Sequence, residues 1–429
     1  MKGRLNLFQA TMLRWRALYP YNAVHVVHVR RPLHRAELIA SIHGQLADFG
    51  MTGLRLGARQ RTYEWTGGPA TAEIRFIAAT DDALTQLDGE IERQLNTAFA
   101  ADGSIDPFRF FAIDCADSFY LGLAYDHFVA GGDSIVQLLH AIIYRRIDGK
   151  RTPAPQLYPA TYRALFARQA WPFLKGLTSL PGLAQGCRRA FRPRYAAATD
   201  GYNAYTHFLV DPAQQARLDR VATAWGVSRN DLWLAVLLKT IAPLAPQRRS
   251  EPRRKVLAVA SIVNVRRDMG AAGDNAFAPM LASFRVGHAV ADNIGMRELA
   301  RAVHGQTNRI KTGKIYLQTL LALGIVAQEW RFLSEAQRHR FFAKHYPVVA
   351  GLTSLNVDML WTPATHEGQA TLEYVRGVAT GPLAPMILAL TNAGGAVVVG
   401  IAFRTTVYQR ETVAMVVVAM QECIRDLGL

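Results

Sequence analysis

The feature that most constrains the fold is the stretch from Ser118 to Ile147, in which a short turn of small residues joins an apolar run to a helical pattern. The run 119–125 is aromatic and aliphatic, and Asp126 and His127 follow it at once. After the turn, apolar residues recur at i, i+3, i+4, i+7 and i+8, the spacing of one helix face: Ile135, Leu138, Leu139, Ile142 and Ile143. The sequence therefore predicts a buried strand, a turn and a helix.

Four residues of this stretch predict how the turn is made. Ser134 and Gln137 have the spacing of a capping box, which would start the helix at the serine. Gly131 and Gly132 permit positive φ angles and close approach of the backbone. We therefore expect His127 to lie at the C-terminal end of the strand, where the turn opens towards a cleft.

A histidine at such a position suits a general base, because a neutral imidazole with a pKa near ~6.5 can accept a proton from a hydroxyl or an amine. The alternative is a hydrogen-bonded structural residue, since the chain contains 12 histidines. Asp126 could orient or charge-pair the ring of His127, although neighbouring strand residues face opposite ways.

Length and composition predict a large soluble protein. The 429 residues, 50% of them hydrophobic, are enough for two or three compact units. Cys115, Cys187 and Cys423 match no metal-binding spacing, so we expect reduced thiols, no metal site and a cytoplasmic location. No apolar run reaches the ~18 residues of a membrane span, which leaves peripheral contact with an anionic membrane as the alternative.

The charge balance favours acidic partners. There are 49 basic and 33 acidic residues, a net charge of +16. The charge is concentrated in two clusters: Arg188, Arg189, Arg192 and Arg194, then Arg248, Arg249, Arg253, Arg254 and Lys255. Such a field attracts an acidic carrier protein, the phosphates of coenzyme A or an anionic membrane face. Nucleic acid is not expected, because no nucleic-acid-binding motif accompanies the clusters. The alternative is a solvated basic surface without a specific partner.

Strand and helix patterns alternate through both halves of the chain and predict an α/β (α+β) protein. The β-rich run 23–29 places His25 and His28 on opposite faces, so they do not form a metal pair. The segment 149–200 is rich in Pro, Gly and Arg and predicts a mobile crossing between the halves. We place the boundary at residue 180, with an N-terminal subdomain, 1–180, that carries His127 and a C-terminal subdomain, 181–429.

The second half contains a nearly unbroken apolar run, Val256–Val265, with Asn264, Arg266 and Arg267 at its end. A run this apolar is buried on both faces, so the polar residues at its end are expected at a cleft or an interface. Three closing segments predict antiparallel strands with a turn at 392–395: Ala370–Arg376, Met386–Leu390 and Ala396–Phe403.

The order of these segments resembles the chloramphenicol acetyltransferase-like superfamily, which includes non-ribosomal peptide condensation domains, polyketide-associated acyltransferases and wax ester synthase/diacylglycerol acyltransferases. The resemblance covers most of the chain. It is carried by NAVHVVHV, LHRAELIASIHGQL, PFRFF, FYLGLAYDHFVAGGDS, GVSRNDLWLAVLLKT, VASIVNVRRD, NAFAPMLASFRV and LTSLNV. It implies two similar subdomains, each a mixed β-sheet flanked by helices, with a tunnel between them.

The family signature is His-His-x-x-x-Asp-Gly, in which the second His is catalytic. In the matching stretch DHFVAGGD, Asp126 takes the place of the first His, and His127 takes the place of the second. Gly131 and Gly132 take the places of the Asp-Gly pair, so the motif is degenerate. The family resemblance therefore implies His127 as the catalytic residue, with the usual Asp missing.

The family Asp usually pairs with an Arg of the second subdomain, for which Arg266 or Arg267 is the matching candidate here. Asp133, two residues after Gly131, could reach a similar place only if the turn is rebuilt. Its alternative role is that of a carboxylate at a helix N-terminus, which the helix dipole favours.

The resemblance implies an acyltransferase that moves an acyl group from a thioester to an alcohol or amine, with His127 as general base, in secondary metabolism. The donor substrate would be acyl-phosphopantetheine on an acyl or peptidyl carrier protein, or acyl-CoA, with no bound cofactor. Ser354, Asn356 and Asn264 are candidate substrate contacts in the tunnel, or form bonds at strand ends. We expect a monomer. The alternatives are a non-catalytic carrier-docking module and a wax ester or diacylglycerol-type acyltransferase.

Overall fold

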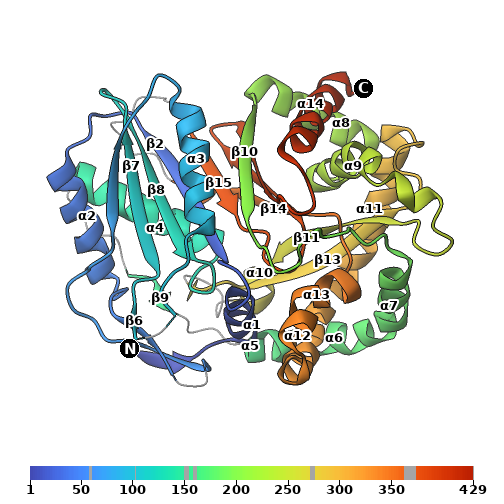
Figure 1. The fold of residues 1–429 in the computed structure, drawn as a ribbon, viewed down its shortest axis with the longest axis horizontal. Coiled ribbons are helices and arrows are strands. Elements are labelled where there is room, and N and C mark those ends of the chain that lie inside the picture. Colours follow the sequence, from blue (N-terminus) through green and yellow to red (C-terminus); the bar gives the residue numbers. More distant parts are fainter. Residues whose placement is uncertain are drawn as a thin grey trace.

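The computed structural model describes residues 1–57, 60–101, 103–148, 154–157, 162–270, 276–361 and 373–428. Figure 1 shows two lobes side by side, one built mainly from the blue to cyan part of the chain and the other from most of the green to red part. Each lobe is built on a mixed sheet with helices against it. The predicted fold class is therefore confirmed, whereas the boundary at residue 180 stays a prediction.

The first lobe contains a five-stranded sheet in the order β15-β2-β8-β7-β5. Its strands are β2 (Asn22–Val29), β5 (Ile74–Ala78), β7 (Phe108–Asp114), β8 (Phe119–Asp126) and β15 (Tyr374–Val378). Helices α2 (Arg35–Asp48) and α4 (Gly132–Asp148) pack against each other, and α3 (Ala83–Asn96) lies towards the second lobe. β8 is buried along nearly its whole length, as its apolar sequence requires. The predicted strand, turn and helix are present.

The second lobe contains a six-stranded sheet in the order β10-β17-β16-β14-β11-β13. Its strands are β10 (Asn203–Val210), β11 (Leu257–Asn264), β13 (Leu281–His288), β14 (Ala350–Asn356), β16 (Met386–Ala393) and β17 (Ala396–Arg404). Packed on it are α8 (Pro212–Trp225), α9 (Arg229–Ile241), α11 (Met296–Thr312) and α14 (Arg410–Asp426). β16 and β17 form the predicted hairpin, whose turn residues Gly394 and Gly395 have φ angles of 58° and 78°.

Strands β11 and β14 are parallel neighbours over only part of their length. Val259–Ser261 of β11 pair with Ala350–Leu352 of β14, and no pairing follows towards their C-terminal ends. The strand ends that carry Asn264 and Asn356 are therefore not held together by main-chain bonds. This end of the sheet faces the turn between β8 and α4, because Asn264 bonds to the first turn of that helix.

The partner of β15 differs from the prediction for the closing segments. Residues 370–372 lie outside the described residues, and Tyr374–Val378 pair antiparallel with β2 of the first sheet rather than with β16. The two sheets come very close here, since a side chain at Gly400 of β17 would collide with the carbonyl oxygen of Arg376. Alternation in sequence predicts a strand but does not identify its neighbour.

The segment 149–200 contains helices where the sequence predicts a mobile crossing. These are α5 (Tyr162–Arg168), α6 (Ala170–Gly176) and α7 (Leu180–Arg189), while residues 149–153 and 158–161 lie outside the described residues. Pro172 and Pro181 fall in the first turns of α6 and α7. A proline there removes no helical hydrogen bond, so proline content did not exclude helices, and the mobility of this crossing stays a prediction.

The remaining elements complete the lobes. A small sheet has the order β1-β4-β3-β6, and β9 pairs with β12. These elements are β1 (Lys2–Arg4), α1 (Leu7–Arg16), β3 (Leu54–Leu56), β4 (Thr62–Trp65), β6 (Ser104–Ile105), β9 (Gln156–Leu157), α10 (Arg266–Met269), β12 (Ala276–Phe277), α12 (Gln318–Glu329) and α13 (Glu335–His345). Among the described helices none alone is long and apolar enough to cross a membrane; only a pair bent by 69°, 296–312 with 315–332, meets that length and composition.

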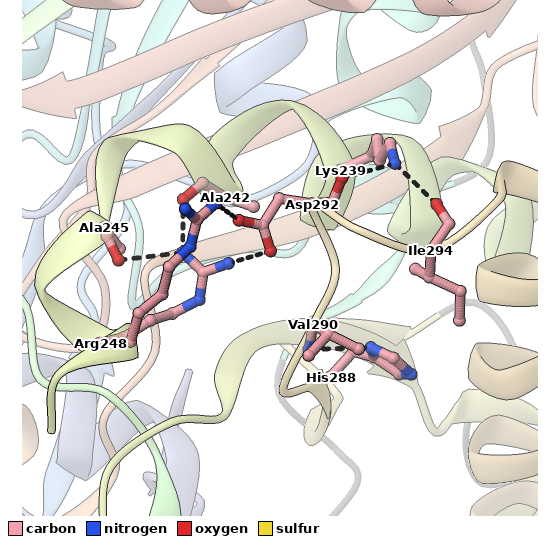
Figure 2. A network of polar contacts seen from close by, with 9 residues as sticks. Lys239, Ala242, Ala245, Arg248, His288, Val290, Asp292 and Ile294 are labelled. Carbon is pink, nitrogen blue, oxygen red and sulfur yellow. Dashed lines mark hydrogen bonds and ion pairs between the residues drawn. The ribbon is translucent and has the colours of Figure 1, made fainter. Parts of the chain in front are cut away.

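The basic cluster 248–255 is partly neutralised inside the protein, as Figure 2 shows. The Arg248 side chain is only 1% exposed, and its guanidinium donates to two carbonyl oxygens just after α9 at 2.7 and 2.9 Å. It also lies 2.5 Å from Asp292 Oδ1, while Arg249 pairs with the other oxygen of Asp292. Arg248 therefore serves the packing of the second lobe and is not available to an external partner.

Removing the carboxylate of Asp292 would leave the buried Arg248 without its counter-ion. We expect Asp292→Ala to lower the free energy of unfolding by about 3 kcal/mol, measured by urea denaturation. Arg253→Ala, at an exposed position of the same cluster, should change it by less than about 0.5 kcal/mol. Equal effects of the two variants would contradict this role of the ion pair.

Candidate active site

His127 is held at the end of β8 by its own backbone and by two aromatic rings. The main-chain N–H of His127 donates to the carbonyl oxygen of Tyr21 at 3.0 Å. The imidazole lies 5.3 Å from the ring of Tyr21 and 5.6 Å from the ring of Tyr125, measured between centroids. The residue is 8% exposed. The predicted place at the strand end is confirmed, with the ring packed into the turn rather than projecting from it.

The hydrogen bonds of the His127 ring determine which nitrogen carries the proton. Nδ1 lies 3.3 Å from the carbonyl oxygen of Ala130, and a carbonyl only accepts, so Nδ1 is the protonated nitrogen. No partner for Nε2 is found in the described part of the chain. Burial lowers the pKa of His127 to about 4. At neutral pH the ring is therefore uncharged, with a lone pair on Nε2 that is free to accept a proton.

The neutral ring of His127 makes the stability of the fold depend on pH. The pKa of the imidazole is 6.5 in an unfolded chain and about 4 in the fold, so between these values the unfolded state binds more protons. With respect to this group the fold is most stable above pH 6.5 and loses about 3 kcal/mol as the pH falls through 4. We expect His127→Gln to reduce this acid-side slope, measured by denaturant unfolding between pH 7 and 4. An unchanged slope would contradict the assignment.

Asp126 contacts a different element from the one that the sequence suggested. Its carboxylate is 1% exposed and lies 2.7 Å from Nη1 of Arg16, at the end of α1. Burial raises the pKa of Asp126 to about 7, and the charge of Arg16 opposes this rise. Asp126 therefore fixes α1 to the end of β8 and does not orient the ring of His127.

The turn after His127 is built differently from the capping box that the sequence predicts. α4 begins at Gly132, so Ser134 lies inside the first turn and its N–H donates to the carbonyl oxygen of Gly131 at 3.1 Å. Neither Gly131 nor Gly132 has a positive φ angle. The expectation of a capping box and of left-handed glycines is therefore wrong. The hydroxyl of Ser134 instead contacts the second lobe.

A polar link joins the first turn of α4 to the end of β11. Asp133 Oδ2 accepts a hydrogen bond from Asn264 and lies 3.7 Å from Nε of Arg266. Nη2 of Arg266 donates to Ser134 Oγ at 2.8 Å and to the carbonyl oxygen of Ala278 at 2.7 Å. Asp133 thus takes part in a polar link between the lobes, through Asn264 and Arg266. Asn264 belongs to this link.

The two arginines that follow β11 should therefore differ in their effect on stability. Arg266 is partly buried in the link, whereas Arg267 is exposed. We expect Arg266→Ala to lower the free energy of unfolding by about 2 kcal/mol, because it removes charge-assisted hydrogen bonds between the lobes. Arg267→Ala is the matched control and should cost less than about 0.5 kcal/mol in the same denaturation experiment. A larger loss from Arg267→Ala would refute the assignment.

Ser354 and Asn356, the other predicted substrate contacts, are exposed residues of β14. Leu355 between them points the opposite way and packs at the start of α4, where its Cδ2 would lie 3.4 Å from a Cβ on Gly132. The structure therefore does not bring Ser354 or Asn356 into contact with His127, and their role in substrate binding stays a prediction.

Sequence reasoning missed a buried polar cluster below the turn. Nδ1 of His25 is 2.8 Å from the hydroxyl of Tyr374, and the ring of His25 lies 5.7 Å from that of Tyr125. Arg376, 3% exposed, approaches Gly132 from β15. The one signal in sequence was a histidine in a strand of valines, because the position of β15 beside β2 could not be predicted.

A surface hollow lined by described residues lies away from His127. It has a volume of about 530 Å³ and lies between α9 and α14, with Trp225, Lys239 and Cys423 in its lining. None of the predicted site residues lines it. The tunnel that the family resemblance implies stays a prediction.

The fold is shared with solved condensation domains. The condensation domain of the Monacolin K polyketide synthase MokA superposes with a TM-score of 0.69 at 11% identity, covering 100% of this chain and 98% of that one. The first condensation domain of the calcium-dependent antibiotic synthetase, solved with substrate analogue 3a, gives 0.68 at 14% identity and covers 100% and 99%. The X-domain of teicoplanin biosynthesis, solved in complex with OxyB, gives 0.58 at 16% identity and covers 99% and 95%.

No protein-family model and no curated protein matches the sequence. The chain nevertheless has the two-lobed fold of condensation domains. The resemblance drawn from the sequence motifs is thus confirmed for the fold.

Proposed function

We propose that this protein is a condensation-like acyltransferase that transfers an acyl group from a thioester to an alcohol or amine, with His127 as general base. The observation that carries the proposal is the tautomer of His127, whose Nδ1 is engaged by Ala130 and whose Nε2 is free to accept a proton. The shared fold of condensation domains supports the reaction class.

The reaction follows from the protonation state of this ring. As the hydroxyl or amine of the acceptor attacks the thioester carbonyl, its proton passes to Nε2 of His127 and a new C–O or C–N bond forms. The tetrahedral intermediate then collapses, the C–S bond breaks, and the proton on Nε2 passes to the departing thiolate. A thioester already has a good leaving group, so no covalent enzyme intermediate is needed.

The donor that we propose is an acyl-phosphopantetheine on an acidic carrier protein, with acyl-CoA as the alternative. This choice of donor is supported by the position of the two basic clusters, which lie next to each other. The main-chain N–H of Phe191 donates to Val256 O at 2.8 Å, and the main-chain N–H of Val256 donates to Arg189 O at 3.2 Å. Apart from Arg249, which pairs with Asp292, the exposed basic residues of the joined surface are Arg188, Arg189, Arg194, Arg253 and Lys255. Such a field attracts an acidic partner.

A second candidate is a binding module without turnover. The deep burial of His127 and its low pKa, about 4, make it a weaker base than a free imidazole. The X-domain with the same fold was solved in complex with OxyB, which shows that this fold can present a surface to another protein. A wax ester or diacylglycerol-type acyltransferase has no separate support in the geometry.

The two candidates differ in turnover, which a panel of carrier-bound and CoA thioesters with alcohol and amine acceptors would detect by mass spectrometry. We expect transfer with the wild type and a loss of at least ~10²-fold in His127→Ala, because a positioned general base contributes ~10² to 10⁴ in rate. His34→Ala, at an exposed histidine, should retain full activity. Turnover that survives in His127→Ala would reject the base, and no turnover with any pair would favour the binding module.

A further inference from the structure

Arg376 is a buried cation that bridges the two sheets. From β15 its Nε donates to Thr391 Oγ1 at 2.9 Å, and its Nη2 donates to Leu390 O at 2.9 Å and to Thr353 O at 3.4 Å. Only 3% of the residue is exposed. Two of the three guanidinium nitrogens are therefore satisfied by β14 and β16.

The charge of Arg376 has no counter-ion in the described part of the protein. No carboxylate of the described residues lies within 4 Å of the Arg376 guanidinium. The carboxylate of Asp133 acts on Arg376 from farther away and is itself paired with Arg266. Its neighbours Tyr125 and Tyr374 have pKa values raised by burial, so they are neutral. Burying an arginine without a paired carboxylate costs free energy, and a ligand that supplies a negative charge would offset part of that cost.

The third nitrogen of Arg376, Nη1, points towards Gly132, on the side where that residue carries no side chain. A Cβ on Gly132 would lie 3.5 Å from Nη1, 3.6 Å from Cε1 of His25 and 3.4 Å from Cδ2 of Leu355. No hydrogen-bond partner of Nη1 is found among the described residues. Gly132 is also the first residue of α4, whose N-terminus carries the positive end of the helix dipole.

Gly132 belongs to the same turn as His127, whose Nδ1 lies 3.3 Å from the carbonyl oxygen of Ala130, two residues before Gly132. The ring of Tyr125 stands between the two histidines, 5.6 Å from the ring of His127 and 5.7 Å from that of His25. Arg376 is also close enough for its charge to help lower the pKa of His127. An anion bound at Nη1 would thus lie within a few bonds of a group that reacts at His127.

We propose that Arg376 Nη1 and the N-terminus of α4 at Gly132 bind a carboxylate of the substrate. The inference rests on the proposed function and defines its substrate class: one reactant carries a free carboxylate a few bonds from its reacting atom. The acceptor would then be a hydroxy or amino acid, or the acyl group would be that of a dicarboxylic acid. A single free guanidinium nitrogen suits a carboxylate better than a phosphate, which usually engages several cationic donors.

Equilibrium dialysis with radiolabelled lactate and, separately, monomethyl succinate would test the site, with sodium chloride keeping the ionic strength constant. Lactate represents a hydroxy-acid acceptor, and the half-ester represents a dicarboxylic acyl group. Binding of either supports the site, and the tighter ligand identifies which reactant carries the carboxylate. If neither binds to the wild type, the proposal is wrong.

Two matched glycine variants make the test specific. Gly132→Ala adds a methyl group beside Nη1 at ordinary contact distances, so the protein should fold while the carboxylate binds at least tenfold more weakly. Gly131→Ala places the same methyl group against Ala278 and Pro279, away from Arg376, and should bind like the wild type. Equal affinity in both variants would overturn the proposal. Thermal unfolding would confirm that both variants are folded.

The outcome is separable from that of the proposed function, because dialysis needs no turnover. His127→Ala should bind the carboxylate as the wild type does, even though it does not transfer. Turnover without carboxylate binding would reject this site alone, whereas carboxylate binding without turnover would reject only the acyltransferase.

Discussion

The pairing of β15 with β2 is the contact on which the arrangement of the two lobes depends. The chain leaves the second sheet after β14, adds a strand to the first sheet, and returns to form β16. Arg376 on that strand bonds back to β14 and β16, so main-chain and charge-assisted bonds join the lobes at the same place. His127 at the end of β8 is therefore set between two bodies that cannot drift apart without breaking a sheet.

The turn after His127 is tied to the second lobe by residues of the helix that follows it. The family motif places an acid before the helix, where this chain has Gly131. Here the acid is Asp133 in the first turn of α4, and it reaches Asn264 and Arg266 from the helix itself. A carboxylate at that position is also favoured by the helix dipole, so the structural and the linking roles of Asp133 reinforce each other.

Local patterns predicted local structure well, and failed where distant segments meet. The apolar run before Asp126 and the helical spacing after it predicted β8 and α4, and the glycine pair predicted the β16–β17 hairpin, because neighbouring residues alone decide these elements. The partner of β15, the burial of Arg248 and the cluster around His25 depend on residues far away in sequence. The helices within 149–200 were missed for another reason, because proline in a first turn was interpreted as a break.

The route of β15 also bears on how the protein forms during synthesis. Strands β2, β7 and β8 are complete once Asp126 has been made, but their sheet gains its edge strand only about 250 residues later, because β15 begins at Tyr374. Until then the first sheet exposes an unpaired, valine-rich edge to other chains in the cell. The N-terminal half therefore passes through a long period in which aggregation competes with folding, and the last quarter of the chain ends it.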